Sequence, residues 1–159
     1  EQGAGSQDSW VLVPLGALHL SPLRVALVDS ICKTCPPGWF WFQRKCYYFS
    51  QSTQTWAEAK TVCALVRARL VVIDSQEKQE FLKRKRPKSR VHWLGLSDQK
   101  TEGKWLWVDG RPLELSFWSS GEPNNSNKED CASMDVDGRW NDLPCTTSDY
   151  WICEMPWVC

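Results

Sequence analysis

Eight cysteines in 159 residues constrain this chain more than any other feature. An even number spread over a domain of this size predicts disulfide bonds, formed outside the reducing cytosol. A zinc site is the competing explanation. It fails because the one Cys-x-x-Cys pair lacks a second such pair, or paired histidines, to complete four ligands. Eight cysteines allow on the order of a hundred pairings, so their spacing alone leaves the connectivity open. The cysteines are Cys32, Cys35, Cys46, Cys63, Cys131, Cys145, Cys153 and Cys159.

The composition divides the chain into two parts. Residues 1–31 hold no cysteine and are rich in Gly, Ser, Leu and Val, so we expect a poorly ordered stalk or linker. Residues 32–159 are expected to form one compact domain, long enough for a real core. The apolar stretch 10–28 is interrupted by Pro, His and Arg, which makes it a poor membrane span. It is also a poor signal peptide, because the leading residues lack a basic cluster. Because the chain starts at Glu1 without Met, it is expected to be a piece of a longer precursor.

The pattern of residues along the compact part predicts a mixture of strands and helices. Apolar residues at helical spacing predict a helix over 55–67, and Asp74 with Glu77 predicts a capping box that opens a second helix carrying Phe81 and Leu82 inward. The segment 111–147 is rich in Gly, Pro, Asn and Ser and is expected to be mostly loop. Strands are expected as a pair within 35–50, then at 69–73, 91–96 and 149–155, and 104–110 is expected to be a strand that runs into a turn at Asp109-Gly110.

A basic run, KRKRPKSR at residues 83–90, ends the second predicted helix. Six of its eight residues are basic, which is compatible with a heparin or phosphate patch. The alternative is a solvated helix end, where cations interact favourably with the helix dipole, and we favour that interpretation. The formal net charge of the whole chain is zero, so no global field favours nucleic acid or membrane partners.

Oxygen-bearing side chains are concentrated in two short segments of the predicted loop. Calcium takes about 6–8 oxygen ligands at flexible angles, and carboxylates this close would repel one another without a cation. The alternative is a solvated acidic loop, which we consider less favourable because the segments lie between aromatic residues. The side chains are those of Glu122, Asn124, Asn125, Glu129, Asp130, Asn141 and Asp142.

Taken together, these motifs resemble the C-type lectin-like domain, over residues 32–159. The resemblance rests on CPPGWFWFQRKCYYF, WAEAKTVC, HWLGL, the GEPNN loop, WND and YWICE, in this order. Within the family it is strongest to type II receptors of the DC-SIGN, prolectin and low-affinity IgE receptor kind. It implies an α+β fold, with two helices flanking a small antiparallel sheet and a loop-rich second sheet carrying calcium. It also implies four disulfides: Cys32–Cys159, Cys35–Cys46, Cys63–Cys153 and Cys131–Cys145.

The same resemblance implies two calcium sites. The principal site would use Glu122, Asn124, Glu129, Asn141 and Asp142, with a cis peptide before Pro123. An auxiliary site, which orders the loop, would use Asp98, Glu102, Asn125 and Asp130. The sugar would contact the five principal residues and Ser126. The order Glu-Pro-Asn resembles members that select mannose, fucose and N-acetylglucosamine over galactose.

The resemblance therefore implies an extracellular, calcium-dependent lectin that binds glycans of glycoproteins or microbial surfaces. It would be the ectodomain of a type II membrane protein or a secreted protein, oligomeric or clustered in its full-length form. The alternative function is a receptor of the same fold for a protein ligand. An enzyme is disfavoured because His19 lies in the linker and His92 in an apolar strand, and no nucleophile–base motif is present. Asn124-Asn125-Ser126 is also a glycosylation sequon, which we expect to stay unmodified in the folded loop.

Overall fold

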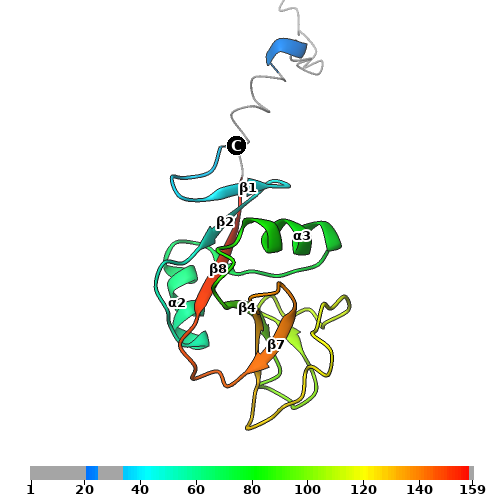
Figure 1. Ribbon diagram of the computed structural model, residues 1–159. Coiled ribbons are helices and arrows are strands. Elements are labelled where there is room, and N and C mark those ends of the chain that lie inside the picture. The colour runs from blue at the N-terminus through cyan, green and yellow to red at the C-terminus, as the bar shows by residue number, and fades with distance from the viewer. Residues whose placement is uncertain (1–20, 25–33, 158–159) are drawn as a thin grey trace, which may run out of the picture.

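The computed structural model describes residues 21–24 and 34–157 and has the expected α+β fold. Two helices cover a central system of strands, with α2 and α3 on different sides of β8 (Figure 1). The predicted stalk, residues 1–31, lies outside the described residues except for 21–24. The elements are β1 (Phe40–Phe42), β2 (Lys45–Phe49), α2 (Trp56–Leu65), β3 (Arg69–Leu70), α3 (Gln76–Lys85), β4 (His92–Ser97), β5 (Leu106–Trp107), β6 (Cys131–Met134), β7 (Trp140–Leu143) and β8 (Tyr150–Pro156).

The strands form one connected sheet in the order β1-β2-β8-β4-β6-β7, with β3 attached to β8 and β5 attached to β4. Every pairing is antiparallel except that of β4 with β8, where His92 lies opposite Tyr150 and Trp93 opposite Trp151. The two sheets expected from the sequence are therefore joined along this parallel pair. The β6–β7 half carries the oxygen-rich loop, and the β1–β2–β8 half carries the ends of the domain.

Two buried clusters hold these layers together. The larger one includes Phe81 and Leu82 of α3, which face inward as expected, together with Trp140 of β7. The smaller one lies under α2 and includes Trp56, Ala59 and Cys63. Each large side chain removed from water contributes about 1.5–3 kcal/mol to folding.

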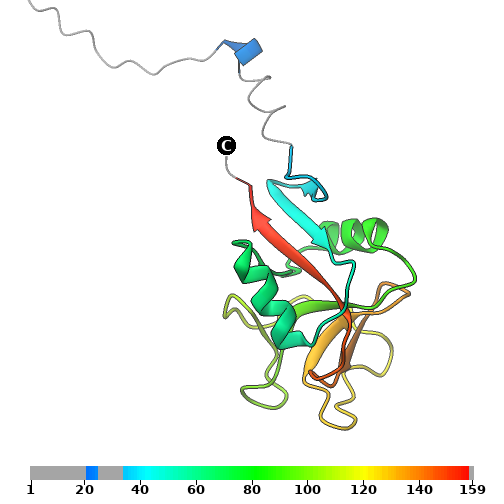
Figure 2. The ribbon, with the colours of Figure 1, turned by 90° about the vertical axis from the view of Figure 1, so that its left-hand side faces the viewer.

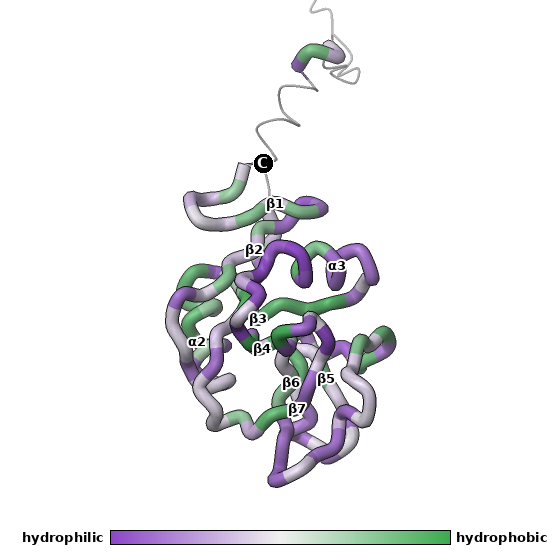
Figure 3. The backbone as a smooth tube through the Cα atoms, viewed as in Figure 1, coloured by the Kyte–Doolittle hydropathy of each residue, from purple (hydrophilic) through white to green (hydrophobic). Residues whose placement is uncertain are grey.

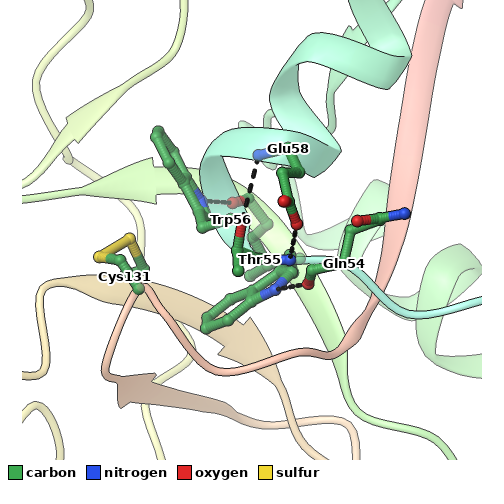
Figure 4. The surroundings of a disulfide bond; sticks show 8 residues. Gln54, Thr55, Trp56, Glu58 and Cys131 are labelled. Atoms are coloured by element: carbon green, nitrogen blue, oxygen red, sulfur yellow. Dashed lines mark hydrogen bonds between the residues drawn. A yellow bond between two sulfur atoms is a disulfide. The ribbon is translucent and has the colours of Figure 1, made fainter.

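Helix α2 begins at a capping box and is tied to the second half of the sheet. The Thr55 hydroxyl accepts the Glu58 N–H, and the Glu58 carboxylate accepts the Thr55 N–H (Figure 4). The next residue, Trp56, donates its backbone N–H to the Cys145 carbonyl at 3.1 Å and its indole N–H to the Leu94 carbonyl at 2.8 Å. The first turn of α2 is thus fixed next to the Cys131–Cys145 disulfide.

The predicted capping box of the second helix is wrong. Ser75, not Asp74, is the N-cap of α3, and its hydroxyl accepts the Lys78 N–H. The Asp74 carboxylate instead forms ion pairs with Lys78 and Arg111 at 3.1 and 3.4 Å. Asp74 is therefore engaged by a local i,i+4 pair and by one long-range pair, while the Ser75 hydroxyl caps the helix one residue later.

The expectation that 111–147 is mostly loop is correct, although two short strands, β6 and β7, lie within it. They pair antiparallel from Cys131 opposite Leu143 to Met134 opposite Trp140. The sequence CASM has small residues with weak strand preference, so its pairing depends on tertiary context. The strand expected at 69–73 is shorter, since only Arg69–Leu70 pairs as β3, with β8.

Three disulfides join the pairs that the resemblance implied: Cys35–Cys46, Cys63–Cys153 and Cys131–Cys145. The fourth implied pair, Cys32–Cys159, lies outside the described residues. Figure 2 shows β1, β2 and the end of β8 at one end of the domain, and the 120–130 loop at the other. Within residues 21–24 and 34–157, no helix has the length and apolar character needed to cross a membrane.

Candidate functional site

The backbone of the loop between residues 119 and 130 enters conformations with positive φ, which Gly and Asn adopt readily. Gly121 has φ +82°, the Glu122–Pro123 peptide is cis, and Asn125 and Asn127 have φ near +50°. Asn enters this left-handed region more readily than most residues. The Asn124 side-chain oxygen accepts the Ser126 N–H at 2.8 Å, which closes a local turn. The loop forms the lower, hydrophilic end of the domain (Figure 3).

Asp142 connects this loop to the sheet. It is fully buried on β7, opposite Ala132 of β6. Its two carboxylate oxygens accept the N–H groups of Asn124 at 3.2 Å and Asn125 at 2.7 Å. A strand residue therefore places the backbone of two predicted ligands.

Glu122 and Asn124 face each other across Pro123. The Asn124 side-chain N–H donates to one Glu122 oxygen at 2.9 Å, and its backbone N–H donates to the other at 3.0 Å. An acid and an amide are thereby held side by side at the exposed tip of the loop.

Electrostatic repulsion is concentrated where the principal site is predicted. Burial, followed by contact with Asp142, raises the pKa of Glu122 above its ordinary value. Burial and repulsion from Asp142 likewise raise the pKa of Glu129. These shifts indicate that the acidic groups of this loop repel one another.

The structure thus brings together Glu122, Asn124, Glu129 and Asp142 of the predicted principal set. Asn141 precedes Asp142 on β7, is half-buried, and accepts the Ser133 hydroxyl with its backbone carbonyl at 3.3 Å. Ser126 lies exposed beside Asn124, so both residues remain accessible to a ligand.

Asp98, Glu102 and Asp130 form a tighter acidic cluster. One oxygen from each lies within 4.8 Å of the others, and among the described residues this is the one place where three such groups come so close. The Gly103 N–H donates to Asp98 at 2.9 Å, and the Asp98 N–H donates to the Asp130 carbonyl at 3.1 Å. Backbone contacts therefore fix two of the three acids in place.

The auxiliary cluster also fits a metal ion chemically. One carboxylate oxygen of Asp98 and one of Asp130 are buried, and neither has a hydrogen-bond partner within the described part of the chain. Burial and mutual repulsion raise the pKa of Asp98 and of Glu102. Buried acceptors without donors are costly unless a cation satisfies them. The fourth predicted ligand, Asn125, is held through its backbone by Asp142.

One residue of the WND motif has a role that the sequence did not reveal. Trp140 is fully buried, and its backbone joins the loop: its N–H donates to the Phe117 carbonyl at 2.9 Å, and its carbonyl accepts the Ser119 N–H at 2.8 Å. The only sequence signal was its position directly before Asn141 and Asp142.

His92 is packed as expected from its apolar strand. It is fully buried, its ring lies 5.8 Å from Phe49 and 5.9 Å from Tyr150, and burial lowers its pKa to about 4. A neutral, enclosed imidazole does not serve as a base for an external substrate.

Comparison with known proteins gives a consistent family assignment. The family model for the Lectin C-type domain matches residues 52–155. C-type lectin domain family 17, member A, of Homo sapiens is 48% identical over 84% of this chain and 35% of its own length. C-type lectin domain family 4 member M of Gorilla gorilla gorilla is 50% identical over 82% of this chain and 36% of its own length. The chain thus spans about a third of the length of these curated relatives.

Solved structures agree with this assignment. The cow C-type carbohydrate-recognition domain of CD23, determined in the presence of a GlcNAc2Man3 oligosaccharide, superposes with a TM-score of 0.76. It is 40% identical in sequence and covers 80% of this chain and 100% of its own. The expected resemblance and fold are confirmed.

Proposed function

The chain belongs to the C-type lectin domain family, and from this premise we propose that it binds mannose-type glycans (mannose, fucose, N-acetylglucosamine) in a calcium-dependent manner. The family recognises carbohydrate and performs no catalysis, so the chain is a binding domain and not an enzyme. The calcium dependence, the sugar class and the residues involved are proposals.

The observation that carries the proposal is the set of unpaired acidic oxygens at the end of the sheet. Asp98 and Asp130 each present a buried oxygen that has no donor among residues 21–24 and 34–157, and Glu102 completes their cluster. Glu122 and Glu129 both repel Asp142 and form a second group of acidic side chains. Hard oxygen donors in this number match calcium better than zinc or copper, which favour nitrogen and sulfur ligands. Asp98, Glu102, Asn125 and Asp130 would hold one ion, and Glu122, Asn124, Glu129, Asn141 and Asp142 the other.

The pairing of acid and amide at the loop tip supports recognition of neighbouring sugar hydroxyls. Calcium, when bound, would take one lone pair from each of two vicinal hydroxyls. The Glu122 carboxylate can then accept a hydrogen bond from one hydroxyl, while the Asn124 amide donates to it. Glu129 and Asn141 offer the same combination to the second hydroxyl. A relative determined with a mannose-containing oligosaccharide supports this sugar class.

We propose an extracellular location and a multivalent mode of binding. Three disulfides among the described residues are typical of proteins that reside in oxidising compartments outside the cytosol. The loop tip is exposed and shallow, so a single sugar should bind weakly, and useful affinity would need several copies on one glycan array. A membrane cluster or an oligomer of the full-length protein would provide this.

A receptor for a protein ligand is the second candidate, and one surface favours it. A cleft of about 410 Å³ beside α2 is lined by aromatic and aliphatic side chains, among them Trp39, Tyr48 and Val66. Leu65 and Val66 at the end of α2 are 78% and 51% exposed. Apolar side chains gathered on a surface are typical of protein contacts.

Mannan binding separates the two candidates. Immobilised mannan should retain the refolded domain in calcium, and release it with EDTA or free mannose but not with galactose. Retention that persists in EDTA would reject the calcium-dependent mechanism. Failure to bind mannan, in a domain that titrates with calcium, would reject the sugar class alone. Calorimetry should count two calcium ions per chain, and Asp98→Asn should reduce this to one.

A further inference from the structure

Gln79 of α3 uses both ends of its side-chain amide inside the protein. It is 3% exposed, its nitrogen donates to the Gly138 carbonyl at 2.7 Å, and its oxygen accepts the Trp140 indole N–H at 2.9 Å. Gly138 lies in the turn between β6 and β7, and Trp140 is the first residue of β7. A single helix residue thus holds the turn and the strand that follows it.

Two further residues of the same helix end contact this turn. A Cβ atom added to Gly138 would lie 2.5 Å from the Lys83 side chain, so the Lys83 stem lies directly over the glycine. Arg86 is 3% exposed and donates to the Val136 carbonyl at 2.6 Å. Gln79 and Lys83 lie four positions apart on one face of α3, and Arg86 is the C-cap residue directly after the helix. Part of the basic run is therefore used to hold the β6–β7 turn.

Trp140 connects the anchored β6–β7 turn to both segments of the proposed sugar site. Its carbonyl accepts the Ser119 N–H at 2.8 Å, and the Ser119 carbonyl accepts the Glu122 N–H at 3.0 Å. On its C-terminal side, Trp140 is followed directly by Asn141 and Asp142. Glu122 and Asp142 are thus linked through Trp140 by hydrogen bonds and covalent bonds.

The indole of Trp140 is the largest element of this link. Its ring contacts Trp107, Phe117 and Trp118 edge to face, with centroids 5.5–5.7 Å apart. These contacts are apolar, and Gln79 supplies the hydrogen-bond acceptor for the indole N–H. A buried N–H that loses its acceptor favours a different ring position or the entry of water.

We infer that Gln79 is a positioning residue for the calcium and glycan site. It fixes the Trp140 indole and thereby the spacing between the Glu122 segment and the Asn141–Asp142 segment. This inference rests on the proposed function. It adds a determinant of affinity on a helix that contributes no predicted ligand.

The test replaces Gln79 by Met in the full 159-residue chain, because Met has a similar length but no polar group. Changes around metal ligands cost about 10–100-fold in affinity when they touch a ligand directly, and Gln79 is one contact further away. We expect the calcium Kd from calorimetry to rise about 3–10-fold, with a parallel loss of mannan binding at a fixed calcium concentration. The control is Glu80→Gln, since Glu80 is the exposed neighbour of Gln79 on the same helix, and it should leave both quantities unchanged.

Hydrogen exchange provides a readout that needs no ligand. In the calcium-free protein, Gln79→Met should accelerate exchange of the Ser119 and Glu122 amides about tenfold, relative to the Gly95 amide in the core. Gln79→Glu, measured below the pKa of its carboxyl, offers the same donor and acceptor as Gln and should restore protection. This second variant also covers the case in which Gln79→Met does not fold.

The outcomes are separable. Unchanged calcium Kd and unchanged amide exchange in Gln79→Met would overturn the positioning role. Acceleration that is equal at Ser119, Glu122 and Gly95 would reduce Gln79 to a general stabiliser and would also overturn it. If the wild-type chain took up no calcium, the proposed function would fail, and the exchange comparison alone would decide whether Gln79 holds the two segments together.

Discussion

The carboxylate of Asp142 accepts the backbone N–H of Asn125 at 2.7 Å, a hydrogen bond between a buried strand residue and the exposed loop tip. The same carboxylate accepts the Asn124 N–H at 3.2 Å. Asp142 therefore has a structural role in the calcium-free protein in addition to its proposed role as a ligand. These two hydrogen bonds order the loop without a ligand, which would reduce the ordering cost of the proposed binding.

Asp142→Asn should separate these two roles. An amide oxygen can still accept one backbone N–H, so the fold should persist, but a charged calcium ligand is lost. We expect calcium affinity to fall at least about 100-fold and mannan binding to disappear, with little change in the circular dichroism spectrum. Glu114→Gln removes an equal charge from an exposed position and should retain calcium binding. Full mannan binding by Asp142→Asn would contradict the proposed site.

The acidic groups also predict how calcium stabilisation depends on pH. The pKa values of Asp98, Glu122 and Glu129 are raised in the calcium-free fold, so that fold binds protons more tightly than the unfolded chain does. These groups therefore favour the calcium-free fold at low pH, and their contribution is lost as the pH rises through the raised pKa values. Calcium binding needs the ionised forms, so its stabilisation has the opposite dependence.

We expect calcium to raise the Tm above its value in EDTA by a large amount at about pH 7.4 and by a small amount at about pH 5. Bound mannan should be released over the same interval. Differential scanning calorimetry in the two buffers measures the first quantity and retention on a mannan column the second. A difference in Tm that is equal at both pH values would be inconsistent with ligation by these carboxylates.

Substitution of Arg86 and of Lys88 tests which residues of the basic run contribute to the stability of the fold. Both belong to KRKRPKSR, but Arg86 is buried and donates to Val136, whereas Lys88 is exposed. Arg86→Ala should lower the free energy of unfolding by about 2 kcal/mol because the Val136 carbonyl loses its donor, while Lys88→Ala should change it by less than about 0.5 kcal/mol. Urea unfolding measures both. Equal effects on stability would show that Arg86 does not anchor the β6–β7 turn.

Asp149 is predicted to destabilise the domain at neutral pH. Burial, with repulsion from Asp135, raises its pKa to about 6. The folded state therefore holds this proton more tightly, and the free energy of unfolding falls as the pH rises from about 4 to above 6. Asp149→Asn should stabilise the protein by about 1 kcal/mol at about pH 7.4, because half-exposure reduces the full effect of the shift. Below the ordinary Asp pKa the variant and the wild type should unfold at equal urea concentrations.

The sequence predicted the elements whose cause is local. Thr55 and Glu58 lie three residues apart, and the apolar side chains of α2 recur at helical spacing, so this helix and its start were accessible from the sequence. The candidate ligands could also be predicted from the sequence, because acids and amides are concentrated in two short segments. The Asp74 capping box was wrong because the neighbouring Ser75 caps the helix, and the Asp74 carboxylate pairs with Lys78 and Arg111 instead.

The features that the sequence did not predict depend on distant contacts. Strand β6 has the sequence CASM, which carries no β-branched or aromatic residue, and its pairing with β4 and β7 is long-range. Gln79 resembles any polar helix residue in the sequence, and its partner Trp140 is 61 positions away. The solvated-end interpretation of the basic run was incomplete for the same reason, since Arg86 reaches the carbonyl of Val136, 50 positions away.

The ends of the described domain lie together, because Lys45 of β2 pairs with Pro156 of β8, at the side remote from the 120–130 loop (Figure 1). A fusion partner attached next to β1 or to the end of β8 would therefore lie on the side remote from the proposed binding tip. The length of an added spacer would then set the distance between the tip and the attached partner. The contacts that the tip makes with a ligand would not change.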